Sequence, residues 1–157
     1  MVSVFATHML STIFFFFCSI LCCSARDTIT PDNLLIDDGG GTLVSSSQTF
    51  ELGFFIPKER FNNGKYIGIW YYGLKDRTVV SIANGANPLF DANIGGLAIA
   101  DDSNLKLVNE SRAAYWFTDL GSSSSMDRAA KLMDSGNFVL SNNRSGKILW
   151  ESFKKPT

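Results

Sequence analysis

The feature that most constrains this chain is a repeated pattern of two apolar runs joined by a polar turn that ends in asparagine. The pattern appears in LAIADDSNLKLV (97–108) and again in AKLMDSGNFVLS (130–141), so that Asn104 and Asn137 are 33 residues apart. Another apolar run follows each copy, carrying Trp116 after the first and Trp150 after the second. Short apolar runs separated by Gly, Asn, Asp and Ser are typical of β-hairpins. Two such units and the segment before residue 95 predict an architecture of three repeats.

The other apolar runs also indicate strands, and helix signals are scarce. QTFELGFFI (48–56) alternates between apolar and other residues, while KYIGIWYYG (65–73) and RTVVSIANG (77–85) are rich in β-branched and aromatic residues. Regularly spaced short strands predict an all-β sandwich, barrel or prism. In the second hairpin we expect a tight turn in which Gly136 takes a positive φ.

The first 25 residues differ from the rest, since they contain no Asp, Glu, Lys or Arg and are strongly apolar from residue 13 to residue 23. Such a run followed by small residues predicts a cleaved signal peptide over residues 1–25, in preference to a membrane anchor or a buried helix. Cleavage would remove every cysteine and the single histidine, leaving residues 26–157 as one domain without disulfides. The net charge of −1, with both signs dispersed, argues against nucleic acid as a partner.

Four blocks of the chain resemble the bulb-type, mannose-binding lectin domain of plant S-locus glycoproteins and S-domain (G-type lectin) receptor-like kinases. In chain order they are TLVSSSQTFELGFF, YIGIWYYGLKDRTVVSIANGANPL, LMDSGNFVL and ILWESFKKPT, and the resemblance covers residues 27–157. It implies a β-prism of three four-stranded antiparallel sheets with tryptophans meeting at the centre. It also implies a secreted recognition module, or a cell-surface one if the product continues into a receptor kinase. The kinase motifs of the longer relatives are absent from these residues, so we expect a fragment, a truncated product or a short secreted form that is not an enzyme.

The resemblance also implies a sugar site with the pattern Gln-x-Asp-x-Asn-x-Val-x-Tyr, whose alternate residues face one side of a strand. The first hairpin presents Ala100, Asp102, Asn104, Lys106 and Val108 at these positions, and the second presents Met133, Ser135, Asn137, Val139 and Ser141. Asp102, Asn104 and Asn137 are therefore candidate carbohydrate ligands of degenerate sites, although a structural turn is the favoured interpretation of each. We expect weak or absent mannose binding, with any remainder at Asp102 and Asn104.

The resemblance places a tryptophan where this chain has Ser81, so Ser81 should leave space beside Trp116 and Trp150, which we interpret as core anchors. Two sequons, NES at Asn109 and NRS at Asn143, are candidate glycosylation sites.

Three functions remain open at this point. A lectin-like module would bind a mannose-type glycan, and a sugar-inactive module would bind a protein or form a homo- or heterodimer with related ectodomains. A carboxylate-based glycosidase using Asp91 with Asp101 or Asp102 is the remote alternative. Asp101 and Asp102 could not flank one glycosidic bond together, because neighbouring strand residues face opposite ways. None of the three requires a metal or another cofactor.

Overall fold

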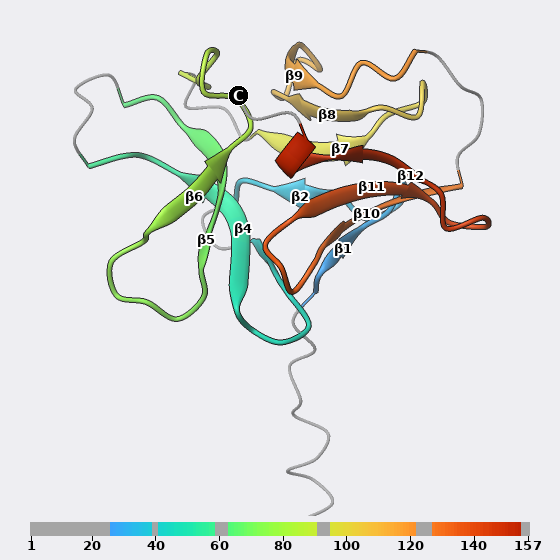
Figure 1. Ribbon diagram of the computed structural model, residues 1–157. Helices are drawn as coiled ribbons and strands as arrows, with labels where there is room; N and C mark the ends of the chain where they lie inside the picture. Colours follow the sequence, from blue (N-terminus) through green and yellow to red (C-terminus); the bar gives the residue numbers. More distant parts are fainter. Residues whose placement is uncertain (1–25, 39–40, 59–62, 91–94, 122–126, 155–157) are drawn as a thin grey trace, which may run out of the picture.

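The computed structural model of this protein describes residues 26–38, 41–58, 63–90, 95–121 and 127–154 (Figure 1). These residues form twelve β-strands and one short 3₁₀ helix. The strands are β1 (Thr28–Ile29), β2 (Leu35–Ile36), β3 (Thr42–Val44), β4 (Phe50–Phe55), β5 (Tyr66–Tyr71), β6 (Val79–Ile82), β7 (Gly96–Ile99), β8 (Leu105–Val108), β9 (Ala114–Phe117), β10 (Arg128–Leu132), β11 (Phe138–Asn142) and β12 (Ile148–Glu151), and η1 covers Ser152–Lys154.

The strands form three four-stranded antiparallel sheets, arranged as the faces of a prism (Figure 1). The first sheet has the order β3-β4-β5-β6, the second β2-β7-β8-β9 and the third β1-β10-β11-β12. Each sheet thus contains three strands consecutive in the chain and one short strand from the N-terminal segment 28–44. The all-β, three-sheet prism predicted from the sequence is confirmed.

The main hydrophobic core lies between the three sheets and draws aliphatic side chains from each of them. Leu52 of the first sheet, Leu107 of the second and Leu140 of the third are all at most 3% exposed. Alternate side chains of β4 face the core: Leu52 is buried in it, and Phe50 and Phe54 pack against it. Burial of each such side chain contributes about 1.5–3 kcal/mol.

The register of the strands shows that the three sheets are equivalent in detail. In each sheet the strand next to the edge (β5, β8 or β11) pairs one of its residues with the edge strand (β6, β9 or β12) immediately before a β-bulge. The equivalent pairs are Ile69–Ser81, Leu107–Trp116 and Leu140–Trp150. Ser81 therefore occupies, in the first sheet, the position that tryptophan occupies in the other two.

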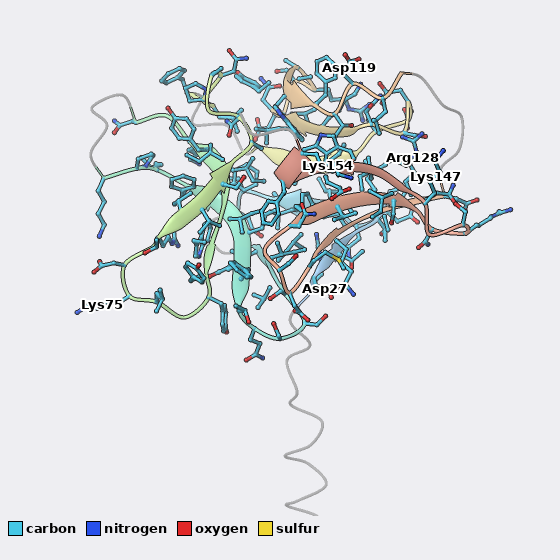
Figure 2. All side chains as sticks on the ribbon, in the orientation of Figure 1. Asp27, Lys75, Asp119, Arg128, Lys147 and Lys154 are labelled. Atoms are coloured by element: carbon cyan, nitrogen blue, oxygen red, sulfur yellow. The ribbon has the colours of Figure 1, made fainter. Side chains whose placement is uncertain are left out.

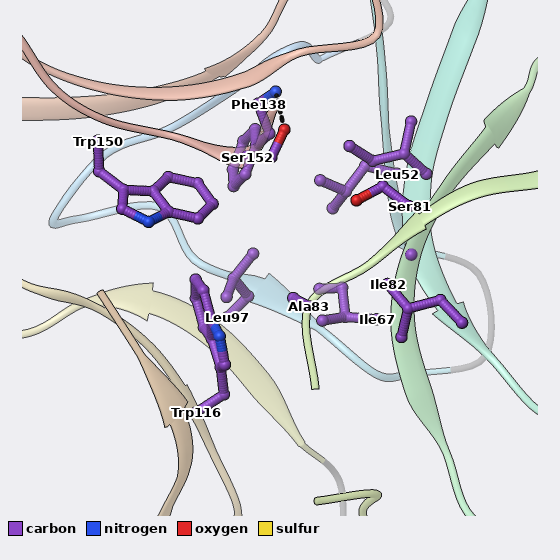
Figure 3. A pocket seen from close by; sticks show the side chains of 12 residues that line it. Leu52, Ile67, Ser81, Ile82, Ala83, Leu97, Trp116, Phe138, Trp150 and Ser152 are labelled. Atoms are coloured by element: carbon purple, nitrogen blue, oxygen red, sulfur yellow. Dashed lines mark hydrogen bonds between the residues drawn. The ribbon is translucent and has the colours of Figure 1, made fainter. Parts of the chain in front are cut away.

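Ser81 leaves the centre of the prism incompletely filled. Trp116 and Trp150 meet edge to face with ring centroids 5.5 Å apart, as core anchors would. Beside them lies a cavity of about 30 Å³, which Ser81 and Leu52 line from the first sheet (Figure 3). The space expected from the serine is present, and its lining is mostly apolar.

Candidate functional site

Asn104 ends the turn between β7 and β8, and the surrounding protein uses both ends of its amide. The side-chain Oδ1 accepts hydrogen bonds from Thr118 Oγ1 at 3.0 Å and from the backbone N–H of Leu120 at 2.8 Å. The Nδ2 group donates to the Gly121 carbonyl at 3.2 Å. Asn104 is only 4% exposed. Its amide therefore ties the start of β8 to the segment that follows β9.

Asn137 makes the same connection in the third sheet. Its Oδ1 accepts from Ser152 Oγ at 3.0 Å and from the Phe153 backbone N–H at 3.2 Å, while Nδ2 donates to Glu151 Oε2 at 3.0 Å. The Ser152 hydroxyl in turn accepts from the backbone N–H of Phe138, as the Thr118 hydroxyl does from Leu105. The sequence repeat thus has a structural cause, because each asparagine accepts a hydrogen bond from the hydroxyl of the residue two positions after the tryptophan.

The first sheet contains a related bridge that the sequence pattern did not indicate. Asn84 follows the edge strand β6 and is 2% exposed. Its Oδ1 accepts from the Ile67 backbone N–H at 2.9 Å, and its Nδ2 donates to the carbonyls of Lys65 and Asn87. Here the asparagine reaches from the edge strand to its neighbour, in the opposite sense to Asn104 and Asn137. This reversal hides it from a search for equal spacing.

Asp102, the other candidate sugar ligand, has both oxygens occupied within its own hairpin. Oδ1 accepts the backbone N–H of Asn104 at 3.1 Å, and Oδ2 is 2.6 Å from the Lys106 ammonium. The hydrogen bond from Lys106, more than the opposing effect of burial, holds the pKa of Asp102 below its ordinary value. Lys106 thus lies beside the carboxylate that a sugar hydroxyl would need.

The turn of the second hairpin is shaped by Gly136, whose φ of +81° confirms the expected positive value. Asp134 in this turn accepts the backbone N–H of Ser47 at 2.7 Å and so connects the third sheet to the first. That hydrogen bond is the main reason why the pKa of Asp134 is lowered. The turn therefore has a structural role that involves Asp134, a residue outside the sugar pattern.

The two sequons differ in their surroundings. Asn143 is exposed in the turn after β11. Asn109 follows β8 and is half-buried, and its Oδ1 accepts the backbone N–H of Ala113 at 2.9 Å. Both positions follow a strand, as expected, but Asn143 is the more accessible.

The acidic residues considered for glycosidase chemistry are only partly described. Asp101 and Asp102 lie in a turn, so the expectation that they are neighbours on a strand is wrong; the polar run there favours a turn over continued pairing. Asp91 lies outside the described residues. Within the described residues, no group of three or more metal-ligating side chains comes together, and no helix is long and apolar enough to cross a membrane.

Three equivalent four-stranded sheets around a central pair of tryptophans define the fold as a lectin-type β-prism. The same fold is found in the solved structure of the Japanese Marasmius oreades lectin, with a TM-score of 0.57 and 17% identity over 81% of this chain and 90% of that one. The model of the D-mannose binding lectin family matches residues 78–157. The chain belongs to this family.

Plant relatives resemble the chain more closely in sequence. A G-type lectin S-receptor-like serine/threonine-protein kinase of Arabidopsis thaliana is 42% identical over 118 residues, which cover 74% of this chain and 14% of that kinase. An S-locus-specific glycoprotein of Brassica oleracea is 42% identical over 120 residues, which cover 74% of this chain and 27% of that glycoprotein. The chain thus spans only the lectin part of these longer relatives, and it resembles the lectin domain of S-domain receptor kinases.

Proposed function

We propose that this chain is an extracellular recognition domain in which mannose binding at the Asp102–Asn104 and Asn137 turns is weak or absent. The observation that carries the proposal is the internal use of the candidate ligands. Asn104 and Asn137 bond to their own edge-strand segments, and Asp102 is paired with Lys106. A sugar hydroxyl would have to compete with these contacts.

The energies support the same conclusion. In the Asp102 unit three of the five pattern positions hold Ala100, Lys106 and Val108 instead of Gln, Val and Tyr. A desolvated hydroxyl that lacks its partner forfeits roughly 1–3 kcal/mol. A site of millimolar affinity has only about 4 kcal/mol in total. Loss of these contacts is enough to abolish binding of a single mannose.

Calorimetry with mannose and oligomannose tests this proposal. We expect no saturation at millimolar monosaccharide for the native chain. A variant with Ala100→Gln, Lys106→Val and Val108→Tyr should gain measurable affinity, and adding Asp102→Ala to it should remove that gain. Submillimolar affinity of the native chain for mannose would refute the weak-site proposal.

The extracellular location rests on the apolar N-terminal run and on the receptor and glycoprotein relatives. We infer removal of residues 1–25 in a secretory pathway, with a mature chain that begins near Arg26. N-terminal sequencing after expression in a eukaryotic secretory host checks this inference. An intact Met1 or retention in the membrane would contradict it.

Protein contact is the second candidate function, and exposed apolar residues on the edge strands favour it. Val80 on β6, Phe117 on β9 and Ile148 on β12 are 43%, 51% and 52% exposed. Edge strands offer unpaired backbone groups to a partner. Analytical ultracentrifugation of the native chain and of Phe117→Thr over a range of concentrations tests self-association. A monomer at all concentrations would exclude a homodimer and leave a different protein as the partner.

A further inference from the structure

The outward face of the first sheet carries a second hydrophobic cluster, formed by Phe55, Tyr66 and Trp70. Trp70 is 1% exposed although it points away from the main core. Two facing glycines, Gly53 and Gly68, make room for this layer, since a Cβ at Gly53 would lie 3.1 Å from the Trp70 ring and one at Gly68 2.7 Å from Phe55. The sheet is therefore built to hold a fixed aromatic layer on its outside.

Trp70 in turn positions Arg77, which comes from the loop between β5 and β6. The indole Nε1 donates to Glu51 Oε2 at 2.8 Å, which fixes the ring. The guanidinium carbon of Arg77 lies 4.7 Å from the ring centroid, at the distance of a cation–π contact. None of the ion pairs found among the described residues includes Arg77. Its planar set of N–H donors is thus oriented and available to a carboxylate.

A cavity of about 450 Å³ lies beside this guanidinium and is lined by Phe55, Ile56, Pro57, Lys58, Lys75, Asp76, Arg77 and Val79. We call it the basic groove. Lys58 and Lys75, like Arg77, are absent from the ion pairs of the described residues, so three cations face one carboxylate, that of Asp76. Lys75 extends from the lower left of the molecule in Figure 2, from the middle of the β5–β6 loop.

A second cavity of about 440 Å³ adjoins the basic groove and shares Phe55, Ile56 and Arg77 with it. Besides Arg77 it contains the cation Lys65, which is neutralised by Asp37 at 2.5 Å, and the carboxylate of Glu51 also lines it. Arg77 therefore stands between a cationic cavity and one in which the charges balance. Together the two adjoining cavities offer one surface with a cationic end and partly apolar walls.

We propose that the basic groove binds an acidic oligosaccharide, with a uronic acid carboxylate on Arg77 and Lys58 and Lys75 as supporting cations. Phe55, Ile56 and Val79 provide the apolar wall against which a sugar ring packs. Charge complementarity selects an anion, and the lectin-type fold favours a saccharide over an acidic peptide. The inference rests on the recognition role proposed above but not on mannose binding, since it uses a different sheet.

Calorimetry with a short, unesterified oligogalacturonic acid tests the proposal, with the fully methyl-esterified oligomer as a neutral ligand. We expect the native chain to bind only the acid form, and to bind it several-fold more weakly when the salt concentration is raised from low to physiological values. Arg77→Gln should weaken binding tenfold or more. Arg77→Lys keeps the charge but loses the planar donor set, so its affinity should lie between those of the native chain and Arg77→Gln. Thermal melting of each variant shows whether it is folded.

Lys147→Gln provides the matched control, because it removes one exposed cation from the opposite side of the molecule (Figure 2). It should change the affinity less than twofold. Equal loss in Lys147→Gln and Arg77→Gln, or no binding of the acid form at millimolar concentration, would overturn the proposal. An aspartate-rich peptide of the same charge that bound more tightly would overturn the saccharide assignment. Mannose binding is measured in a separate titration with Asp102→Ala. A chain that does not bind the acidic oligomer therefore leaves the weak-mannose proposal intact.

Discussion

Replacement of Asn104 by alanine separates the structural from the ligand-binding interpretation of the turns. The change removes two accepted hydrogen bonds and one donated bond at a position that is 4% exposed. The buried Thr118 hydroxyl and the half-buried Leu120 N–H lose their acceptor, and an unsatisfied buried group costs about 1–3 kcal/mol. We therefore expect Asn104→Ala to lower the free energy of unfolding by about 2–4 kcal/mol. That is a large part of the 5–15 kcal/mol typical of such a domain.

Two matched variants calibrate this loss. Asp102→Ala in the same turn removes a surface pair, whose carboxylate is 32% exposed, and the hydrogen bond from the Asn104 backbone N–H, and we expect a loss of about 1 kcal/mol from it. Asn137→Ala removes an equivalent but half-buried amide, whose partners water can reach, and should cost about 1–2 kcal/mol.

Urea unfolding followed by tryptophan fluorescence measures all three variants, with unchanged m-values as the check on two-state behaviour. The expected order of destabilisation is Asn104→Ala, then Asn137→Ala, then Asp102→Ala. A loss below about 0.5 kcal/mol for Asn104→Ala would refute the structural interpretation, because surface side chains kept for a ligand have effects of that size.

Three further predictions follow from other contacts. Ser81→Val should raise the free energy of unfolding by about 1 kcal/mol in the same assay, since it fills part of the 30 Å³ cavity with apolar atoms. Ser81→Trp should lower it by about 1–3 kcal/mol, because an indole is larger than the cavity. Lys106→Val should raise the pKa of Asp102 toward its ordinary value, because the Lys106 hydrogen bond is the main cause of the depressed pKa. In the native chain the stabilisation of the fold by ionised Asp102 is present above the ordinary aspartate pKa and is lost as the pH falls through the lowered pKa. NMR titration of the Asp102 carboxyl carbon measures this pKa in both chains. Peptide mapping of secreted protein should find the glycan at Asn143 more fully occupied than at Asn109, and unmodified Asn at both positions would contradict this.

The hairpins and their repeat could be predicted from the sequence because their signals are local. The polar turns before Asn104 and Asn137 interrupt apolar runs, and Gly136 supplies the positive φ that its turn requires. The similar spacing of Trp116 and Trp150 after Asn104 and Asn137 reflects equivalent pairing positions in two sheets. These features depend on residues close together in the chain, so the order of residue types along the sequence is enough to predict them.

Other features depend on contacts that no local pattern contains. The strands β1 and β2 are two residues long, too short for any periodicity, and they join sheets formed by residues a hundred or sixty positions later. The hydroxyl partners of the asparagines, Thr118 and Ser152, do follow the tryptophans by two residues, so that signal was available. The stacking of Arg77 on Trp70 was not, because it requires the fold of the β5–β6 loop.

The three sheets together explain why recognition would move away from the hairpin turns. Each sheet needs an amide that bridges an edge-strand segment and its neighbour, and Asn84, Asn104 and Asn137 supply it from different sides. An amide held in this way has few hydrogen bonds left for a sugar, and a sugar that took them would oppose folding. In the first sheet the bridge lies just after the edge strand β6, while the outward face carries Trp70 and the Arg77 guanidinium, which takes part in no ion pair of the described residues. A ligand bound to Arg77 breaks none of the bonds that hold the prism together, which makes this face the place where affinity and stability do not compete.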